Sequence, residues 1–200
     1  MSSEKIDTRT KILNAAWALL EAGEPSAVRM SDVAKRAGLS RQAVYAHFPS
    51  RAELLIAVTR HIDAVKDVDA MLAASRAAEN GVARLSAYVE AWGGYMPEVY
   101  GVAKALIAMR ETDEAAREAW ADRLAAIRHG CAAAVEALER DGALSPRWTE
   151  EEATDLLCTL LSIRNWEEFT KDCGWSQQEY VERMKSITAR ILLSDDALAT

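Results

Sequence analysis

Apolar residues recur every three or four positions along most of the chain, which is the spacing of one face of an α-helix. Alanine is abundant, and the alternating runs of β-branched residues that indicate strands are absent. The first apolar stretch predicts a helix over residues 7–22, and Gly23 suits the left-handed backbone that often ends a helix. The apolar face of this helix consists of Ile12, Leu13, Ala16, Leu19 and Leu20. The pattern therefore predicts an all-α protein.

Two short helices are predicted next, over residues 31–37 and 41–48, with Gly38, Leu39 and Ser40 between them. A longer helix is predicted from Ser50 onwards. Ser50 is followed three residues later by Glu53, and this spacing is that of a capping box, in which each residue bonds the backbone of the other at the start of a helix.

The predicted helices lengthen beyond residue 80 and cover residues 82–95, 97–110, 113–140, 150–172 and 177–193. Two of them begin with a capping box, formed by Thr149 with Glu152 and by Ser176 with Glu179. Gly93, Gly94 and Pro97 predict a break between the first two of these helices, because proline usually ends or begins a helix.

The segment from Met30 to Phe48 has the pattern of two helices that cross closely. Ala34 is small enough for a close crossing, Gly38 permits a positive φ in the turn, and Ser40 is placed to cap the second helix. The apolar positions that pack the pair together are Val33, Ala37, Leu39 and Val44. The outward side chains of the second helix are Arg41, Gln42, Ala43 and Ala46. A helix presented in this way fits the major groove of DNA.

The run from Val33 to Leu55 resembles the DNA-binding domain of the TetR/AcrR family of bacterial regulators. The resemblance covers residues 8–60 and rests on Ala-Gly-Leu-Ser, on Val-Tyr-Ala-His-Phe and on the Arg-Ala-Glu-Leu-Leu that follows. It implies a three-helix, helix-turn-helix DNA-binding domain joined to a larger helical domain for ligand binding and dimerisation. The remaining residues match the family only in general organisation.

The resemblance also implies individual roles for the motif residues. Arg41 and Gln42 correspond to positions that face base edges, where arginine reads guanine and glutamine reads adenine, and Ala43 to one that contacts a thymine methyl group. The residues implied as phosphate ligands are Tyr45, His47, Arg51, Ser31 and Lys35. One departure is Arg29, which stands where the family commonly has a threonine or serine, so that either Ser31 caps the helix or Arg29 itself reaches a phosphate.

Charge is distributed unevenly along the chain. Residues 1–60 hold nine Lys and Arg against six Asp and Glu, although the whole chain has a formal net charge of −7. A basic N-terminal module on an acidic body agrees with a nucleic-acid-binding face in the first part. We expect a DNA-binding domain over residues 1–50 and a ligand-sensing and dimerisation domain over residues 51–200, connected by the helix that begins at residue 50.

The second part is rich in aromatic residues, since five of the six tryptophans lie beyond residue 80. In the family this domain encloses a ligand cavity, and aromatic walls favour an apolar or aromatic effector, with carboxylates nearby for a cation. The alternative is that these side chains simply form core. The candidate ligand-binding residues are Trp92, Tyr95, Met96, Tyr100, Met109, Trp120 and Trp166.

The last two predicted helices carry apolar stripes that suit a four-helix dimer interface. A palindromic operator calls for a two-fold dimer. The alternative is that these stripes lie within the core of one chain. The candidate interface residues are Leu156, Leu160, Ile163, Tyr180, Met184, Ile187 and Ile191.

Several classes of protein are excluded by the sequence. It holds no Walker, GxGxxG, HExxH or GxSxG motif, so we expect no enzyme, no metal site and no cofactor. Cys131, Cys158 and Cys173 lack the spacing of a disulfide framework or a zinc site. No apolar run is long enough to span a membrane, and the polar residues 1–5 do not resemble a signal peptide, so a cytoplasmic protein is expected.

The sequence thus predicts a sequence-specific transcriptional regulator, namely a repressor that a small apolar or aromatic ligand releases from a palindromic operator in double-stranded DNA. It is expected to act as a homodimer. The alternative is a helical ligand-binding or interaction protein whose helix-turn-helix is vestigial.

Overall fold

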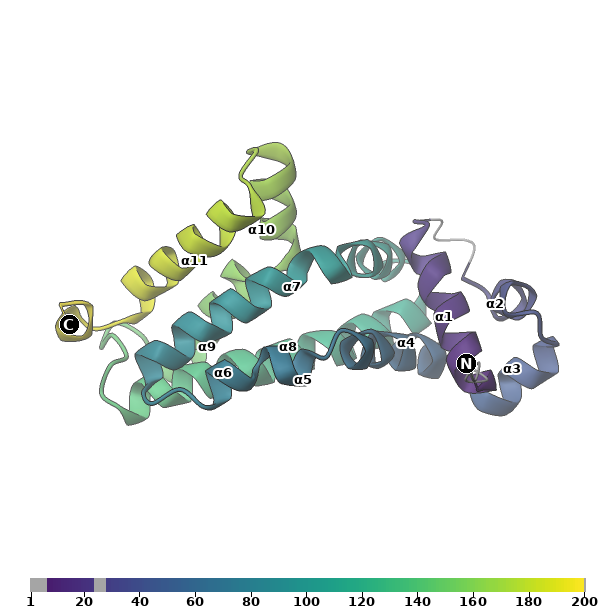
Figure 1. Cartoon of the computed structure of the whole chain (residues 1–200), viewed down its shortest axis with the longest axis horizontal. Helices are drawn as coiled ribbons and strands as arrows, with labels where there is room; N and C mark the ends of the chain where they lie inside the picture. Colours follow the sequence, from purple (N-terminus) through teal and green to yellow (C-terminus); the bar gives the residue numbers. More distant parts are fainter. Residues whose placement is uncertain (1–6, 24–27, 200) are drawn as a thin grey trace, which may run out of the picture. The chain divides into compact units, whose positions relative to one another are not determined.

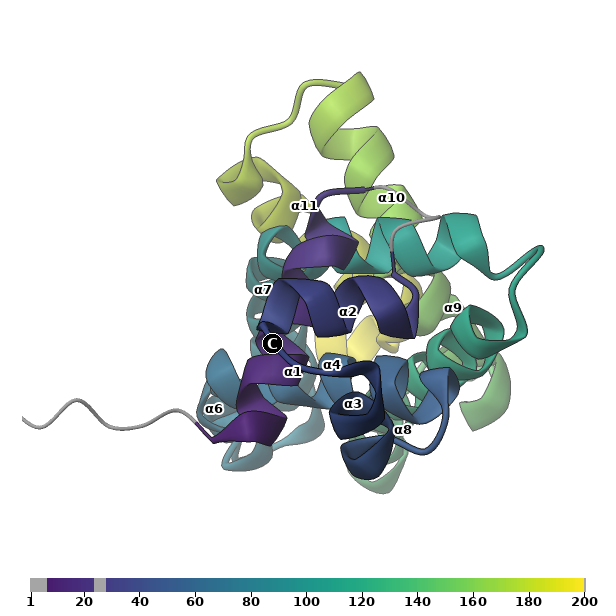
Figure 2. The same cartoon turned by 90° about the vertical axis from the view of Figure 1, so that its right-hand side faces the viewer.

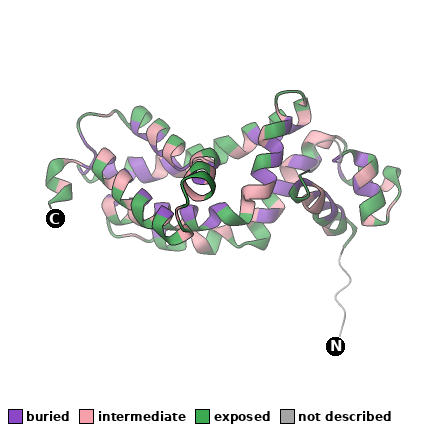
Figure 3. Cartoon of the chain, turned by 90° about the horizontal axis from the view of Figure 1, so that it is seen from above, coloured by how far each residue is buried: buried purple, intermediate pink, exposed green. Residues whose placement is uncertain are grey.

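The computed structural model describes residues 7–23 and 28–199, and the polar segment 1–5 lies outside this range. The described residues are helical, with an isolated antiparallel bridge between Leu144 and Leu193 (Figure 1). Each long helix has a buried stripe and an exposed one, as its apolar spacing predicts (Figure 3). The all-α fold is therefore confirmed. None of the helices in these ranges is long and apolar enough to cross a membrane.

The chain forms two compact units, of which the first comprises residues up to 66 together with 99–124. It contains α1 (Thr8–Glu21), α2 (Met30–Ala37), α3 (Arg41–His47) and α4 (Arg51–Val65). In this unit α1 packs against α2 and α4, and α2 packs against α3. The fully buried side chains that join these helices include Ile12, Leu20, Val33, Val44, Leu54 and Leu55.

The second unit comprises residues 67–98 and 125–200. Its elements are α5 (Val68–Met71), α6 (Ala73–Arg76), α9 (Glu150–Leu160), α10 (Ile163–Glu167), a π-helical turn at Glu168–Asp172, α11 (Gln177–Leu192) and α12 (Asp195–Leu198). Two long helices, α7 (Gly81–Met109) and α8 (Glu114–Arg140), contribute a part to each unit. The first compact unit thus contains α4 together with α1, α2 and α3. The functional boundary at residue 50 stays a prediction.

The predicted break at Gly93, Gly94 and Pro97 is wrong, because α7 runs without interruption through all three residues. Gly93 is buried against α11, where a Cβ atom would lie 3.2 Å from Val181 Cγ2. The glycine therefore serves a close approach of two helices rather than a turn. Proline removes one helical hydrogen bond, and the carbonyl that this leaves without its helical donor is bonded by another side chain, as described below.

The single helix predicted over residues 150–172 is also wrong. α9 ends at Leu160, and Ser162 starts a new helix by accepting a hydrogen bond from the backbone N–H of Asn165, at 3.3 Å. The capping boxes at Thr149 and at Ser176 are confirmed in both directions. A serine or threonine N-cap is a strong start signal, and Ser162 acts as one inside an otherwise continuous apolar pattern.

Two of the residues predicted at a dimer interface belong to the core of the chain. Tyr180 and Met184 have no exposed surface within the single chain, and Ile163 is nearly buried. A side chain without exposed surface has nothing to offer a partner, so the core interpretation is correct for Tyr180 and Met184. The remaining predicted interface residues are half-buried, namely Leu156, Leu160, Ile187 and Ile191.

Candidate nucleic-acid interface

No side chain of its N-cap residue caps the start of α2. Arg29 occupies the N-cap position, and its carbonyl accepts hydrogen bonds from the N–H groups of Asp32 and Val33, each at 3.0 Å. Its side chain makes no capping bond. Ser31 lies inside the helix and is exposed, so it does not provide the cap. The Arg29 and Ser31 side chains are therefore both presented at the surface of the first turn.

The turn between α2 and α3 has the geometry that the sequence predicts. Gly38 has a φ of +68°, and the N–H of Leu39 closes the turn on the carbonyl of Ala34 at 2.9 Å. Ser40 then caps α3 by accepting from the N–H of Ala43 at 3.1 Å. These interactions fix the direction in which α3 leaves α2, since the left-handed residue and the cap each restrict the backbone.

α3 comes directly after α2, and both helices face the viewer in Figure 2. Its side chains are buried on one side of the helix and exposed on the other. Val44 is fully buried, and Phe48 just after the helix is nearly so. Arg41, Gln42, Tyr45 and His47 are exposed, whereas Ala43 is half-buried. The described helix therefore brings the predicted base-reading residues Arg41 and Gln42 to the first turn of the exposed face.

Arg41 and Tyr45 lie one turn apart on α3 and contact each other. The guanidinium carbon of Arg41 lies 5.5 Å from the centre of the Tyr45 ring, and its Nη2 donates to the tyrosine hydroxyl at 3.5 Å. Tyr45 is 39% exposed, which is unusual for a large aromatic side chain that a core could use. The contact holds the flexible arginine over one face of the helix, and it reduces the rotamer entropy that a binding event would cost.

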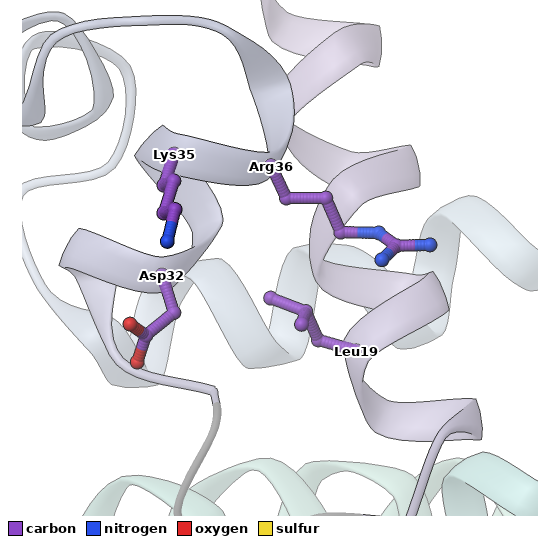
Figure 4. Close-up of a pocket in the computed structure, with 4 residues that line it drawn as sticks. All are labelled: Leu19, Asp32, Lys35 and Arg36. Atoms are coloured by element: carbon purple, nitrogen blue, oxygen red, sulfur yellow. The ribbon is translucent and has the colours of Figure 1, made fainter.

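A shallow depression lies between α1 and α2 and is lined by Leu19, Asp32, Lys35 and Arg36 (Figure 4). In this view Arg36 extends above Leu19, and Lys35 lies above Asp32 to the left of them. Lys35 and Arg36 are exposed. Residues 28–50 hold four Lys and Arg against one acidic residue, Asp32, so the helix pair carries a net positive charge. Such a charge attracts the phosphate backbone of a nucleic acid.

Arg51 is held by protein groups at the start of α4. Its Nε donates to the carbonyl of Val28 at 2.6 Å, and its Nη1 forms an ion pair with Asp113. Each of the two charged side chains keeps about a quarter of its surface exposed, at 23% and 24%. A phosphate contact by Arg51 therefore has to use the remaining N–H groups or replace the bond to Asp113.

Asp113 serves two helices at once. Its Oδ1 accepts from the N–H of Ala116 at 3.3 Å and so caps α8, while its Oδ2 bonds Arg51. Burial by itself raises the pKa of the carboxyl, but the hydrogen bonds from Arg51 and from the backbone of Ala116 outweigh burial and hold the pKa below its ordinary value. Sequence reasoning assigned Asp113 only to the start of a helix, because nothing in the linear pattern links it to Arg51.

Two further ion pairs join α4 to α8 within the same unit. Arg60 bonds Asp122 at 2.6 Å, and Arg123 pairs with Asp63 in a partly buried position. α4 is therefore attached to α8 at its beginning and in its second half. Since α4 directly follows α3, these ion pairs connect α8 to the helix that comes next after the exposed face.

The predicted ligand-binding residues divide between the two units. Trp92, Tyr95, Met96 and Trp166 are buried in the second unit. Tyr100, Met109 and Trp120 belong to the first unit, where Met109 and Trp120 are buried and Tyr100 is half-buried. In the first group the rings of Trp92 and Tyr95 lie 5.7 Å apart. Gln177 links Trp166 to α7, because its Oε1 accepts from Trp166 Nε1 at 2.9 Å and its Nε2 donates to the carbonyl of Gly93 at 2.8 Å.

Tyr180 is the residue that sequence reasoning placed elsewhere. Its side chain is fully buried beside Gly93 and Phe169, and its hydroxyl has no hydrogen-bond partner among the described residues. Burial raises the pKa of this hydroxyl, so it is protonated and available as a donor. Its position in an apolar stripe gave no signal of this, because a tyrosine at helical spacing looks like any other core residue.

The helix pair and its neighbouring helices lie in a part of the chain that is similar to known proteins. Residues 12–58 match the model described as "Bacterial regulatory proteins, tetR family". A curated relative, the nucleoid occlusion factor SlmA from a Marinomonas strain, is 36% identical over 63 residues, and the match covers 32% of this chain and 32% of that protein. The match thus spans about a third of the length of this relative.

Solved structures match over nearly the whole chain. A putative TetR-family transcriptional regulator from Rhodococcus has a TM-score of 0.73 at 21% identity, covering 92% of this chain and 98% of its own. A putative transcriptional regulator from Saccharomonospora viridis, solved with choline, has a TM-score of 0.71 at 19% identity and covers 93% and 97%. At these identities the likeness concerns the fold. Residues 12–58 thus match the model of the tetR family of bacterial regulatory proteins, and the chain as a whole shares the fold of these solved regulators.

Proposed function

We propose that this protein is a sequence-specific DNA-binding repressor. The observation that carries the proposal is the exposed face of α3, on which Arg41 and Gln42 lie in the first turn behind a Ser40 cap. An arginine and a glutamine at this place match the bidentate recognition of guanine and adenine in the major groove. A dimer bound across a palindrome excludes other proteins from the same DNA, which is the simplest route to repression.

The phosphate contacts of the proposal come from exposed side chains around this face. Lys35 and Ser31 on α2 and Tyr45 and His47 on α3 are all exposed. Arg51 is proposed to bind phosphate through the guanidinium N–H groups that do not bond Val28 or Asp113, or by releasing Asp113 and binding the phosphate in its place. Because such contacts release counterions, the affinity is expected to fall steeply with salt.

A homodimer is the proposed assembly, formed by the helices at the end of the chain. α9 and α11 contact each other, and each keeps one pair of apolar residues four positions apart partly exposed, Leu156 with Leu160 and Ile187 with Ile191. Partly exposed apolar side chains at this spacing suit a helical interface. Sedimentation of Leu160→Asp should show a monomer, with Leu198→Asp as the control on the exposed end of the chain.

The proposed effector is a small apolar or aromatic molecule that binds in the second unit and releases the DNA. Support comes from the buried Trp92, Tyr95 and Trp166 and from the unpartnered hydroxyl of Tyr180. The adjoining π-helical turn at Glu168–Asp172 is of a kind that is frequent at functional sites. The relative solved with choline shows that a chain of this fold holds a small organic cation, so a quaternary ammonium compound on aromatic faces belongs in the same screen.

The test of the regulator function is binding of the purified full chain to the DNA around its own gene, at about 50 and 200 mM salt, where phosphate contacts predict a large difference. Scrambled DNA of equal length is the control. Specific, salt-sensitive binding supports the proposal and yields the operator. If selection from random duplexes also returns no preferred sequence, the helix-turn-helix is vestigial and the chain is a ligand-binding or interaction protein.

A further inference from the structure

Two of the three cysteines meet in the second unit. Cys131 on α8 and Cys158 on α9 are neighbours whose thiol groups influence each other, and neither cysteine is in a disulfide. Cys131 has no exposed surface, whereas Cys158 is half-buried and so has access to solvent. Cys173, which follows the π-helical turn, is exposed.

The contact between α8 and α9 is fixed by the groups around these thiols. Arg128 stands one turn before Cys131 on α8 and forms an ion pair with Asp155, which stands one turn before Cys158 on α9. The two helices are thus joined by a charged pair and by a thiol pair at neighbouring positions. The ion pair therefore places the turns of α8 and α9 that carry the two cysteines next to each other.

Tyr88 supports the buried thiol from a third helix, α7. Its hydroxyl lies 3.6 Å from the Cys131 sulfur and 3.5 Å from the carbonyl of Ile127. Gly130 makes room for it, since a Cβ atom there would come within 2.7 Å of the tyrosine oxygen. Tyr88 therefore holds the Cys131 side chain in place from α7.

The pKa values of the two thiols are shifted in opposite directions, as expected for one reacting thiol and one resolving thiol. The hydrogen bond from Cys131 lowers the pKa of Cys158, and the positive charge of Arg128 adds to this against the opposing effect of burial. The same hydrogen bond, followed by burial, raises the pKa of Cys131. Cys158 is also the thiol with access to solvent, whereas Cys131 is fully buried, so burial and acidity both favour Cys158 as the reacting group.

We propose that Cys131 and Cys158 form a reversible disulfide in response to a hydroperoxide, with Cys158 as the reacting thiolate and Cys131 as the resolving thiol. The Cys158 sulfur attacks one oxygen of the peroxide, an S–O bond forms, and the O–O bond breaks. The leaving oxygen takes a proton and departs as water or an alcohol, and Cys158 is left as a sulfenic acid.

The second step closes the bond between α8 and α9. The Cys131 sulfur attacks the Cys158 sulfur and forms the S–S bond while the S–O bond breaks, and the hydroxide leaves with the proton of Cys131 as water. Two electrons pass from the two thiols to the peroxide, and a dithiol reductant returns them. The proposal concerns the thiols alone, so it stands or falls independently of DNA binding.

The experiment exposes the reduced, full-length protein to hydrogen peroxide, blocks the remaining thiols with iodoacetamide after denaturation, and measures the mass. The expected product has lost two hydrogen atoms, carries one alkyl group at Cys173, and yields a single peptide pair that links Cys131 to Cys158. Dithiothreitol should restore three alkylated cysteines. Oxidation confined to Cys173, disulfides between chains, or an unchanged Cys158 at the end of the exposure would overturn the proposal.

Four single variants separate the steps. Cys158→Ser should abolish the internal disulfide, whereas Cys131→Ser should leave a sulfenic acid on Cys158 that dimedone labels. Cys173→Ser is the control and should oxidise as the wild type does. Arg128→Gln removes the positive charge and should slow the oxidation several-fold. Circular dichroism identifies any variant that does not fold, and a folded Cys131→Ser without dimedone label contradicts the assignment of Cys158.

Discussion

The side-chain amide of Gln177 donates a hydrogen bond of 2.8 Å to the carbonyl of Gly93, four residues before Pro97. In a regular helix the N–H of residue 97 makes this bond, and proline has none. α11 thus replaces from outside the bond that α7 lacks, and a proline is accommodated inside a helix of 29 residues.

The first prediction concerns this replacement. Gln177→Ala leaves the Gly93 carbonyl and Trp166 Nε1 without these partners, and each unsatisfied buried group costs about 1–3 kcal/mol. Pro97→Ala restores a backbone donor for Gly93. Chemical unfolding of both single variants and the double variant should show a smaller penalty for Gln177→Ala in the Pro97→Ala background, and equal penalties in the two backgrounds would contradict the role of Gln177.

A second prediction concerns the pH dependence of the ion pair between Arg51 and Asp113. The pKa of Asp113 lies below its ordinary value of 3.8 in the folded chain, so the pair adds stability above that pH and loses it as the pH falls through the folded pKa. The free energy of unfolding should therefore fall between about pH 6 and pH 3, and this fall should be about 1 kcal/mol larger in the wild type than in Asp113→Asn. Arg51→Gln serves as the matched variant on the other side of the pair, and it should remove the same difference.

A third prediction separates two exposed glycines. Gly38 has a positive φ and open space around it, so Gly38→Ala is strained without any clash and should destabilise by about 1 kcal/mol. Gly94 lies inside α7, also in open space, so Gly94→Ala should stabilise by about 0.5–1 kcal/mol through helix propensity. The midpoint of thermal unfolding should fall for Gly38→Ala and rise for Gly94→Ala. A lower midpoint in both variants would show that alanine is strained at position 94.

A fourth prediction tests which residue reads the DNA. Arg41→Ala should weaken binding to the selected operator by about 1–3 kcal/mol and relax the preference at one base pair. Arg41→Lys keeps the charge but not the bidentate geometry, so it should lose the preference while retaining most of the non-specific affinity. Tyr45→Phe removes a hydroxyl proposed to bind phosphate, so it should lower the affinity for all DNA sequences alike. An unchanged preference in Arg41→Lys would assign base reading to another residue.

The last prediction concerns the unpartnered hydroxyl of Tyr180. Tyr180→Phe removes a buried polar group without a partner, so it should leave the stability of the chain unchanged or raise it. If the hydroxyl anchors an effector, the same variant should bind acetophenone more weakly than the wild type, by tryptophan fluorescence, and ethylbenzene equally. Tyr88→Phe is the control, since its hydroxyl is already hydrogen-bonded. Equal acetophenone binding by Tyr180→Phe and the wild type would remove Tyr180 from the effector site.

Local signals determined much of the fold from the sequence alone. The helix-turn-helix followed from residues close together in the chain, because Gly38, Ser40 and Val44 act on their own turn, cap and neighbouring helix. The capping boxes at Thr149 and Ser176 were predicted for the same reason. Such features depend on backbone groups within four residues, which a linear pattern contains.

Tertiary structure decided what depends on distant partners. Pro97 does not interrupt α7 because Gln177 lies across from Gly93, and Arg51 is bound because Asp113 caps a helix that begins far along the chain. Tyr180 is core and not interface because α7 and Phe169 cover it. Spacing along a helix shows that a residue has an apolar face, but only the packed structure determines which surface covers that face, since burial is a property of all the elements together.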